Sequence, residues 1–155
     1  MTYPLVSIIT VNYNQTQLTL ELLTSLAQIT YPKIEIIVVD NASRESPKVA
    51  IEQQFPNVKV IESDTNLGFA GGNNLGISIA KGSFCLFLNN DTEVEPSFLE
   101  PLVNAMKDNP KMGIAAAKLR YFDAKDILQF AGSSAMHAWK IQSFAFYASE
   151  VMIKC

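Results

Sequence analysis

The chain has 155 residues, of which 48% are hydrophobic and 17% are charged, and its formal net charge is −3. This balance is typical of a folded globular protein and excludes an intrinsically disordered chain. A mildly acidic chain without a basic cluster has no positive field to draw a phosphate backbone, which excludes non-specific nucleic-acid binding. The length predicts a single domain over residues 1–155.

Apolar runs and helical periodicity alternate along the chain. The run at 5–11 is short and β-branched, and the run at 34–39 is apolar almost throughout, so both predict buried strands. Residues 17–28 instead place leucines at helical spacing. The full pattern predicts strands at 5–11, 34–39, 58–61, 84–88 and 114–119, and helices at 17–28, 47–55, 75–81 and 95–109. This order predicts an α/β fold, in which an α/β/α sandwich is built on a mostly parallel sheet.

Two segments do not fit this alternation. Residues 66–74 contain three glycines, and we expect them to form a glycine-rich loop that leads into the helix at 75–81. Residues 131–155 carry several aromatic side chains with neither a strand period nor a helix period, so no element is predicted in this tail.

Polar clusters follow three of the predicted strands. They are residues 12–14 after the first strand, 40–41 after the second and 89–91 after the fourth. Ligands of open α/β sheets bind at the carboxyl ends of the strands, so we expect the three clusters to meet in one cleft. The candidate ligand-binding residues in these clusters are Asn12, Tyr13, Asn14, Asp40, Asn89, Asn90 and Asp91.

Asp91 is the candidate for binding a metal ion. A carboxylate at the mouth of a sheet binds a hard divalent cation through oxygen, and such a cation shares its other ligands with substrate phosphates. The cation would neutralise the charge that develops on a diphosphate leaving group. A second interpretation stays open, in which residues 90–92 form only a turn whose side chains bond to their own backbone.

Asp40 and the glycine-rich segment also have two interpretations each. An acidic residue at a strand end accepts hydrogen bonds from a ribose or a base, but aspartate is equally suited to cap a following helix. Closely spaced glycines let the backbone approach an anionic ligand, or they form a plain strand-to-helix turn. Their spacing matches neither a phosphate-binding loop nor a dinucleotide-binding loop, which argues against a Rossmann-type dinucleotide enzyme.

Four segments occur in a telling order: VSIITVNYN at 6–14, IVVDNAS at 37–43, NLGFAGGNNLG at 66–76 and LFLNNDT at 86–92. Together they resemble the first strand, the second strand with its nucleotide-binding aspartate, the donor loop and the D-x-D segment of family-two glycosyltransferases. This family has the GT-A fold, and the likeness is greatest to its rhamnosyltransferase-like branch. The resemblance covers residues 4–120.

The resemblance implies a role for each matching position. Asp40 would contact the base or the ribose of the nucleotide, and Asp91 would bind Mg²⁺ or Mn²⁺ that bridges the diphosphate. Asn89 stands where the family often has an aspartate, so its contact would be weaker or indirect. Asn12 and Tyr13 would line the base pocket. The backbone around Gly71 and Asn73 would close the donor site.

The resemblance also implies a reaction. A sugar would pass from a dTDP-sugar or UDP-sugar to a hydroxyl group of a glycan or lipid-linked acceptor, with inversion at the anomeric carbon. Relatives of this kind build cell-surface polysaccharides in the cytoplasm at the inner face of the cell membrane. We therefore expect the same location and a peripheral association with the membrane.

The catalytic base has no candidate in this sequence. In the family, an acidic residue that deprotonates the acceptor hydroxyl follows much later in the chain. No such motif is recognised after Asp91, because Asp123 and Asp126 come too early. The sequence therefore predicts a chain truncated at its C-terminus, and the alternative function is a nucleotide-binding module without transfer activity.

Overall fold

The computed structural model describes residues 2–130 and 150–154. The strands are β1 (Val6–Asn12), β2 (Ile34–Asp40), β3 (Lys59–Glu62), β4 (Phe84–Asn89), β5 (Ile114–Ala116), β6 (Leu119–Tyr121), β7 (Ala124–Phe130) and β8 (Glu150–Lys154). The helices are α1 (Thr16–Leu26), α2 (Lys48–Gln54), α3 (Gly68–Ile77) and α4 (Leu99–Asp108).

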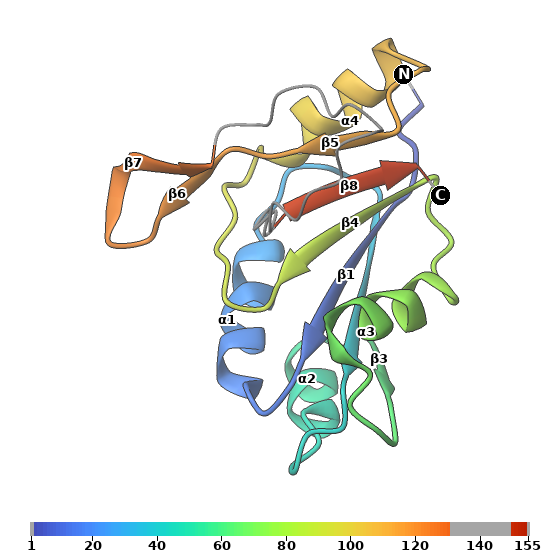
Figure 1. Cartoon of the computed structure of the whole chain (residues 1–155), viewed down its shortest axis with the longest axis vertical. Coiled ribbons are helices and arrows are strands. Elements are labelled where there is room, and N and C mark those ends of the chain that lie inside the picture. The colour runs from blue at the N-terminus through green and yellow to red at the C-terminus, as the bar shows by residue number, and fades with distance from the viewer. Residues whose placement is uncertain (1, 131–149, 155) are drawn as a thin grey trace, which may run out of the picture.

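A central sheet of six strands has the order β3-β2-β1-β4-β8-β5 (Figure 1). The strands β3, β2, β1 and β4 run parallel, which confirms the predicted α/β fold with a mostly parallel sheet. Asn12 of β1 pairs with Asp40 of β2, and Val11 pairs with Asn89 of β4. The carboxyl ends of these three strands therefore lie level and side by side.

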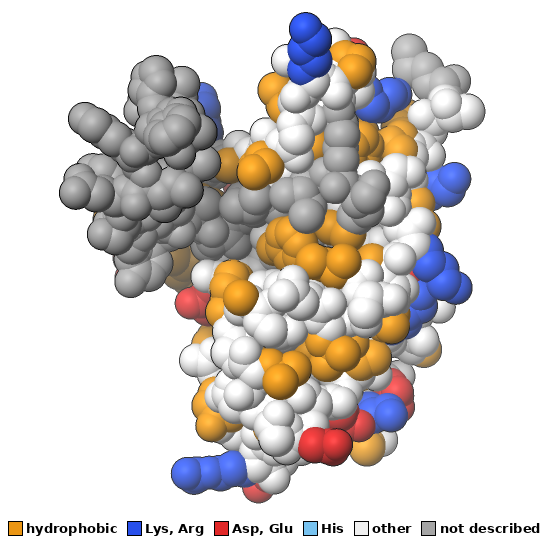
Figure 2. Space-filling view, turned by 45° about the vertical axis from the view of Figure 1, so that its right-hand side comes forward, with side chains coloured by type: hydrophobic (Ala, Val, Ile, Leu, Met, Phe, Trp, Pro, Cys, Tyr) orange, Lys and Arg blue, Asp and Glu red, His pale blue; other side chains and the backbone are white. Residues whose placement is uncertain are grey.

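Helices cover both faces of this sheet (Figure 1). Helices α1, α2 and α4 contribute buried side chains such as Leu22, Ile51 and Met106 to the larger core cluster on one face. Helix α3 packs on the other face against a smaller cluster that includes Ile9 and Ile37. Figure 2 shows hydrophobic side chains gathered in the middle of the face in view, with charged side chains toward its edges.

Most of the glycine-rich segment is helical, so the predicted boundary between a loop at 66–74 and a helix at 75–81 was wrong. Helix α3 begins at Gly68 and ends at Ile77. A Cβ atom on Gly76 would lie 2.5 Å from Cγ2 of Ile9, and one on Gly72 would lie 3.0 Å from both methyl groups of Val11. The glycines therefore let the helix lie close to the sheet, and this packing outweighs their low helix propensity.

Strand β8 lies inside the tail for which no element was predicted. It runs antiparallel to both β4 and β5 and joins them into one sheet. Its Met152 is fully buried. A strand of only five residues that pairs on both sides is too short for its sequence pattern to reveal it. The rest of the tail, residues 131–149, lies outside the described residues.

Two further boundaries differ from the sequence-based expectation. The strand predicted at 114–119 is divided into β5 and β6, and β6 pairs with β7 in a separate antiparallel hairpin. The helix predicted from residue 95 begins at Leu99, because Glu95–Phe98 form a turn in which the Phe98 N–H donates to the Glu95 carbonyl oxygen at 3.1 Å.

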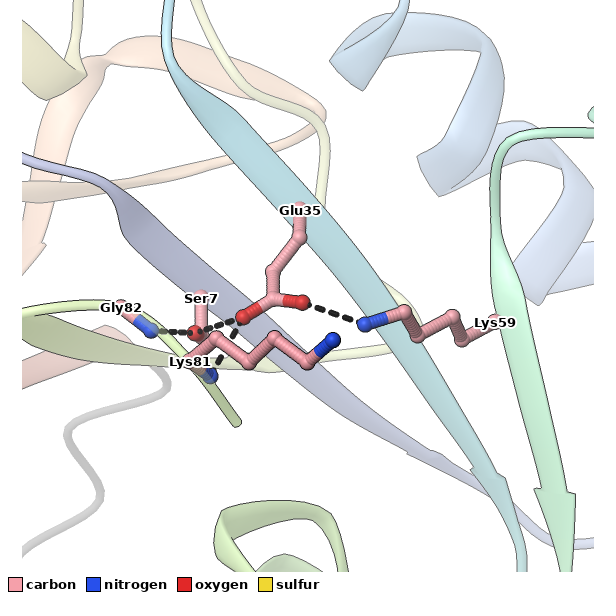
Figure 3. A network of polar contacts seen from close by, with 5 residues as sticks. All are labelled: Ser7, Glu35, Lys59, Lys81 and Gly82. Atoms are coloured by element: carbon pink, nitrogen blue, oxygen red, sulfur yellow. Dashed lines mark hydrogen bonds and ion pairs between the residues drawn. The ribbon is translucent and has the colours of Figure 1, made fainter. Parts of the chain in front are cut away.

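A polar network joins the amino-terminal parts of the parallel strands, at the end of the sheet opposite to the carboxyl ends (Figure 3). Glu35 accepts hydrogen bonds from the Ser7 hydroxyl at 2.7 Å, the Lys59 ammonium at 2.6 Å and the Lys81 backbone N–H at 2.6 Å. The Gly82 N–H donates to Ser7 Oγ at 2.8 Å. Burial opposes ionisation of Glu35, but these hydrogen bonds and the Lys59 charge outweigh it and lower the pKa of the carboxyl group.

Candidate functional site

A pocket of about 390 Å³ opens at the carboxyl ends of β1, β2 and β4. Four of the predicted site residues line it, namely Tyr13, Asn89, Asn90 and Asp91. The remaining lining residues come from the same strand ends and from the start of α3. They are Val11, Gln15, Asn41, Asn66, Gly68 and Phe69.

Asn12 and Asp40 do not line this pocket, because both are buried beneath it, with 0% and 3% of their surface exposed. The Asn12 amide Nδ2 donates to Asp40 Oδ1 at 2.9 Å and to Ser43 Oγ at 3.1 Å. The Ser43 hydroxyl donates to Asp40 Oδ1 at 2.5 Å, and its backbone N–H donates to Oδ2 at 3.3 Å. The Asp40 carboxylate therefore holds the turn that follows β2, which is a local contact of the kind that aspartate makes in turns.

Asn14 also lies outside the pocket lining, in an exposed loop. Its backbone has a φ of 55°, a left-handed conformation that asparagine tolerates. Its N–H donates to Ser43 Oγ at 2.8 Å, and its side-chain Oδ1 accepts from the Arg44 N–H at 2.8 Å. Asn14 thus fastens the loop after β1 to the loop after β2.

A buried chain of hydrogen bonds links this pair of loops to the end of β4. The Thr19 hydroxyl on α1 donates to Asn12 Oδ1 at 2.9 Å. The Asn90 amide Nδ2 donates to Thr19 Oγ1 at 3.2 Å and to Gln15 Oε1 at 3.3 Å. Sequence reasoning missed Gln15 and Thr19. The signal for Thr19 was its position three residues before Leu22, which puts a hydroxyl group on the buried face of an otherwise apolar helix.

Asn41 fixes the start of α3 at the rim of the pocket. Its amide Nδ2 donates to Asn66 Oδ1 at 3.0 Å and to the Gly68 carbonyl oxygen at 3.2 Å, and its Oδ1 accepts from the Leu67 N–H at 2.9 Å. All three contacts come from a side chain that is only 3% exposed. The pocket wall formed by α3 is therefore tied to the end of β2.

Gly71 and Asn73 lie within α3 and do not line the pocket. A Cβ atom on Gly71 would lie 2.6 Å from Cβ of Leu67, so this glycine allows the chain to turn into the helix. Asn73 is buried and donates to the Phe69 carbonyl oxygen at 3.1 Å.

Two aromatic side chains line the pocket and are unusually exposed. Tyr13 is 48% exposed, and Phe69 is 59% exposed. Phe69 was not predicted as a site residue, although it stands inside the segment that resembles a donor loop. Exposed aromatic rings at a pocket provide apolar surface on which a flat ligand group can stack.

Asp91 is exposed and is the sole carboxylate among the residues that line the pocket. Within residues 2–130 and 150–154, no group of three or more histidine, cysteine, aspartate or glutamate side chains is placed to hold a metal ion. A single carboxylate suits Mg²⁺ or Mn²⁺ that takes its other ligands from water and substrate phosphates, rather than a metal enclosed by the protein alone. The residues present therefore fit a metal that arrives with a phosphorylated ligand.

The turn after β4 holds Asp91 at the pocket. The Thr92 hydroxyl donates to the Asn89 carbonyl oxygen at 2.8 Å, so the turn interpretation of residues 90–92 also has a contact in its favour. The two interpretations are compatible, because the bond involves the backbone of Asn89 and leaves the Asp91 carboxylate at the pocket.

Comparison with known proteins identifies a family for this chain. Residues 7–148 match the sequence profile described as Glycosyl transferase family 2. An uncharacterized glycosyltransferase of Haemophilus influenzae is 36% identical over 108 residues, which are 70% of this chain and 36% of that protein. The poly(ribitol-phosphate) beta-glucosyltransferase of Bacillus spizizenii is 34% identical over 128 residues, which are 79% of this chain and 20% of that protein.

Solved structures agree with the fold. The Pyrobaculum calidifontis mannosyltransferase PcManGT, in complex with GDP-Man and Mn²⁺, has a TM-score of 0.68 at 24% identity and covers 75% of this chain and 36% of its own. S. aureus TarS 1-349, in complex with UDP-GlcNAc, has a TM-score of 0.59 at 29% identity and covers 66% of this chain and 31% of its own. The matched part of the chain thus spans about a third or less of each of these proteins.

No helix among the described residues is both long enough and apolar enough to cross a membrane.

Proposed function

Because the chain belongs to glycosyl transferase family 2, we propose that it binds the donor of a sugar-transfer reaction, a sugar linked to a nucleoside diphosphate. The observation that carries the proposal is the pocket at the carboxyl ends of β1, β2 and β4, with the Asp91 carboxylate and two exposed aromatic rings in its wall. Ligands of open α/β sheets bind at this place.

The nucleotide occupies the part of the pocket between the β1 loop and the start of α3. The rings of Tyr13 and Phe69 offer apolar surface to a base, and the exposed amide of Asn66, which Asn41 holds in place, offers polar atoms to a ribose. Asp40 lies beneath the pocket and supports it indirectly, because its carboxylate holds the turn that follows β2. Any direct contact it makes with the nucleotide falls to Oδ2, because Oδ2 accepts one hydrogen bond whereas Oδ1 accepts two.

The base of the donor is uracil or thymine. The UDP-GlcNAc held by TarS, at 29% identity, supports a UDP-sugar, and the resemblance of the four segments to the rhamnosyltransferase-like branch supports a dTDP-sugar. Both bases present the same pattern of carbonyl oxygens and N–H, and they differ by one methyl group. A pocket lined by amides and aromatic rings accommodates either of them.

The diphosphate lies beside Asp91. This carboxylate would hold Mg²⁺ or Mn²⁺, which supplies positive charge to the diphosphate as the bond to the sugar breaks. Asn89 lines the pocket where the family often has a second acid, so its amide would offer a neutral hydrogen bond and adds no negative charge. A single protein charge then faces the metal, which leaves most of its ligands to phosphate and water.

The full reaction would transfer the sugar to a hydroxyl group with inversion, in the synthesis of a cell-surface polymer at the cytoplasmic face of the membrane. The name of the Bacillus spizizenii relative supports a polymer acceptor. Transfer needs a base that takes the acceptor proton, and Asp91 is the sole carboxylate among the described residues of the pocket. The second candidate function is a nucleotide-binding module without transfer activity, which needs only the donor pocket.

Replacement of Asp91 tests the proposal. We expect Asp91→Asn to abolish the strengthening of UDP binding by Mn²⁺, because the amide carries no charge for the metal, and to weaken binding roughly tenfold or more when Mn²⁺ is present. Isothermal titration calorimetry with and without Mn²⁺ measures both effects. Glu93→Gln is the matched control, since Glu93 is an exposed acid two residues away that does not line the pocket. Equal Mn²⁺ dependence in the Asp91→Asn variant and the wild-type chain would refute the role of Asp91.

A further inference from the structure

The hydroxyl group of Thr19 lies where three strand ends are joined. It contacts Asn12 at the end of β1 and Asn90 just after β4, and Asn12 in turn contacts Asp40 at the end of β2. Thr19 and Asn12 are 0% exposed, and Asn90 is 8% exposed. Thr19 itself does not line the pocket, so it reaches the ligand only through its neighbours.

The direction of every hydrogen bond in this chain is determined by its ends. The Asp40 carboxylate only accepts, so the Asn12 amide must turn Nδ2 toward it and Oδ1 toward Thr19. The single hydrogen of the Thr19 hydroxyl then donates to Asn12 Oδ1 at 2.9 Å, in preference to the more distant Gln15 carbonyl oxygen at 3.3 Å, and Oγ1 accepts from Asn90 Nδ2. A chain that ends on a charged acceptor is stronger than neutral pairs, because each bond polarises the next.

We propose that Thr19 is a positioning residue of the donor site, which orients the Asn90 side chain and thereby the adjacent Asp91. This inference rests on the proposed function. It adds to it a chain of hydrogen bonds that connects the ends of β1 and β2, on the nucleotide side of the pocket, with the turn after β4, on the metal side. Without the Thr19 hydroxyl, Asn90 Nδ2 keeps only the 3.3 Å bond to Gln15, a residue that is exposed. The start of the turn that carries Asp91 would then be held less firmly.

Three variants at Thr19 separate positioning from packing. Thr19→Val has nearly the same volume but lacks the hydroxyl, so Asn12 Oδ1 and Asn90 Nδ2 each lose a partner. Thr19→Ser keeps the hydroxyl and loses a methyl group. Thr19→Ala also removes the hydroxyl, and because alanine favours helix it decides the question if the valine variant does not fold. Thr24→Val is the matched control, since Thr24 is exposed on the same helix and its hydroxyl bonds only to the Leu20 carbonyl oxygen at 2.8 Å.

The test measures UDP affinity by calorimetry with and without Mn²⁺, and stability separately by thermal unfolding. We expect Thr19→Val and Thr19→Ala to lower the strengthening of UDP binding by Mn²⁺ about tenfold, which corresponds to one buried hydrogen bond lost at the metal side. Thr19→Ser and Thr24→Val should stay within about twofold of the wild-type chain, because a factor of two lies below the worth of a buried hydrogen bond.

Two outcomes would overturn the inference alone. One is a Thr19→Val or Thr19→Ala variant that melts at a lower temperature but keeps the full Mn²⁺ effect, since Thr19 would then serve only the packing of α1. The other is a Thr19→Ser variant that loses as much of the Mn²⁺ effect as Thr19→Val. A folded wild-type chain that binds no UDP or dTDP would instead overturn the proposed function, and this inference with it.

Discussion

Individual side chains have different roles at the two ends of the parallel strands. At the carboxyl ends, amides and hydroxyls such as Asn12, Thr19 and Asn90 use their hydrogen bonds to arrange a pocket. At the amino-terminal ends, the Glu35 carboxylate accepts hydrogen bonds from three other segments (Figure 3), and it is not among the residues that line the candidate pocket. We therefore expect substitutions at the first end to change ligand binding and substitutions at Glu35 to change stability.

Glu35→Gln should destabilise the folded chain by roughly 1–2 kcal/mol at neutral pH, because it removes the charge that strengthens three hydrogen bonds. The pKa of Glu35 is lowered in the folded state, mainly by the bonds from Lys59, Ser7 and Lys81, which outweigh the effect of its burial. The extra stability is therefore present above the unfolded-state pKa of about 4.3 and is lost as the pH falls through the folded-state pKa.

Urea unfolding over a series of pH values measures this difference. The wild-type chain should lose its advantage over Glu35→Gln only as the pH drops below about 4. Glu52→Gln, which changes an exposed acid on α2, is the control and should unfold like the wild-type chain throughout. An advantage of the wild-type chain that is independent of pH would mean that shape rather than charge explains the role of Glu35.

Sequence patterns located the strand ends at which the candidate site residues lie, but they did not determine where each side chain points. The polar residues after β1, β2 and β4 were found because they follow apolar runs directly, and Tyr13, Asn89, Asn90 and Asp91 do line one pocket. Asn12 and Asp40 were found by the same rule, yet their side chains turn inward and bond to each other. Periodicity locates the end of a strand, but the direction of a side chain at that end depends on its three-dimensional neighbours.

Among the helices and strands, α3 differs most from what its sequence predicts. Glycine has a low helix propensity, so the nine residues 66–74, which include three glycines, were interpreted as a loop. The close approach of Gly76 to β1 and β2 explains the difference, since Ile9 and Val39 occupy the space where a side chain would stand. The strands β1, β2 and β4 and the helix α1 were predicted because burial of their apolar side chains determines their sequence pattern.

Gly76→Ala separates the two effects. Propensity alone would stabilise the helix by about 1 kcal/mol, but a Cβ atom 2.5 Å from Ile9 Cγ2 must displace the helix or the strand. We expect a net loss of about 1–3 kcal/mol in the free energy of unfolding, as for other overpacked cores. Gly113→Ala is the contrast, because nothing lies within 4 Å of its added Cβ atom, and it should be neutral or slightly stabilising. A Gly76→Ala variant as stable as the wild-type chain, measured by urea unfolding, would contradict this account of α3.

At the scale of the whole molecule, the parallel strands β3, β2, β1 and β4 carry the pocket, and the antiparallel pair β8 and β5 extends the same sheet on the side of β4. The family match runs from residue 7 to 148, beyond the residues on which the resemblance was recognised. The parallel half follows from the alternation of strands and helices. The position of β8 does not, because the pairing of a short strand with partners far away in the chain leaves no local pattern.

The central claim is that the pocket at the carboxyl ends of the parallel strands binds a nucleoside diphosphate together with a divalent metal. The most direct measurement is a calorimetric titration of UDP and of dTDP into the purified wild-type chain, with and without Mn²⁺. We predict binding of at least one of the two nucleotides, at least about tenfold tighter with Mn²⁺, because Asp91 supplies a single charge that a metal can bridge to the diphosphate. Absence of binding by either nucleotide, in a chain shown to be folded by circular dichroism, would contradict the account.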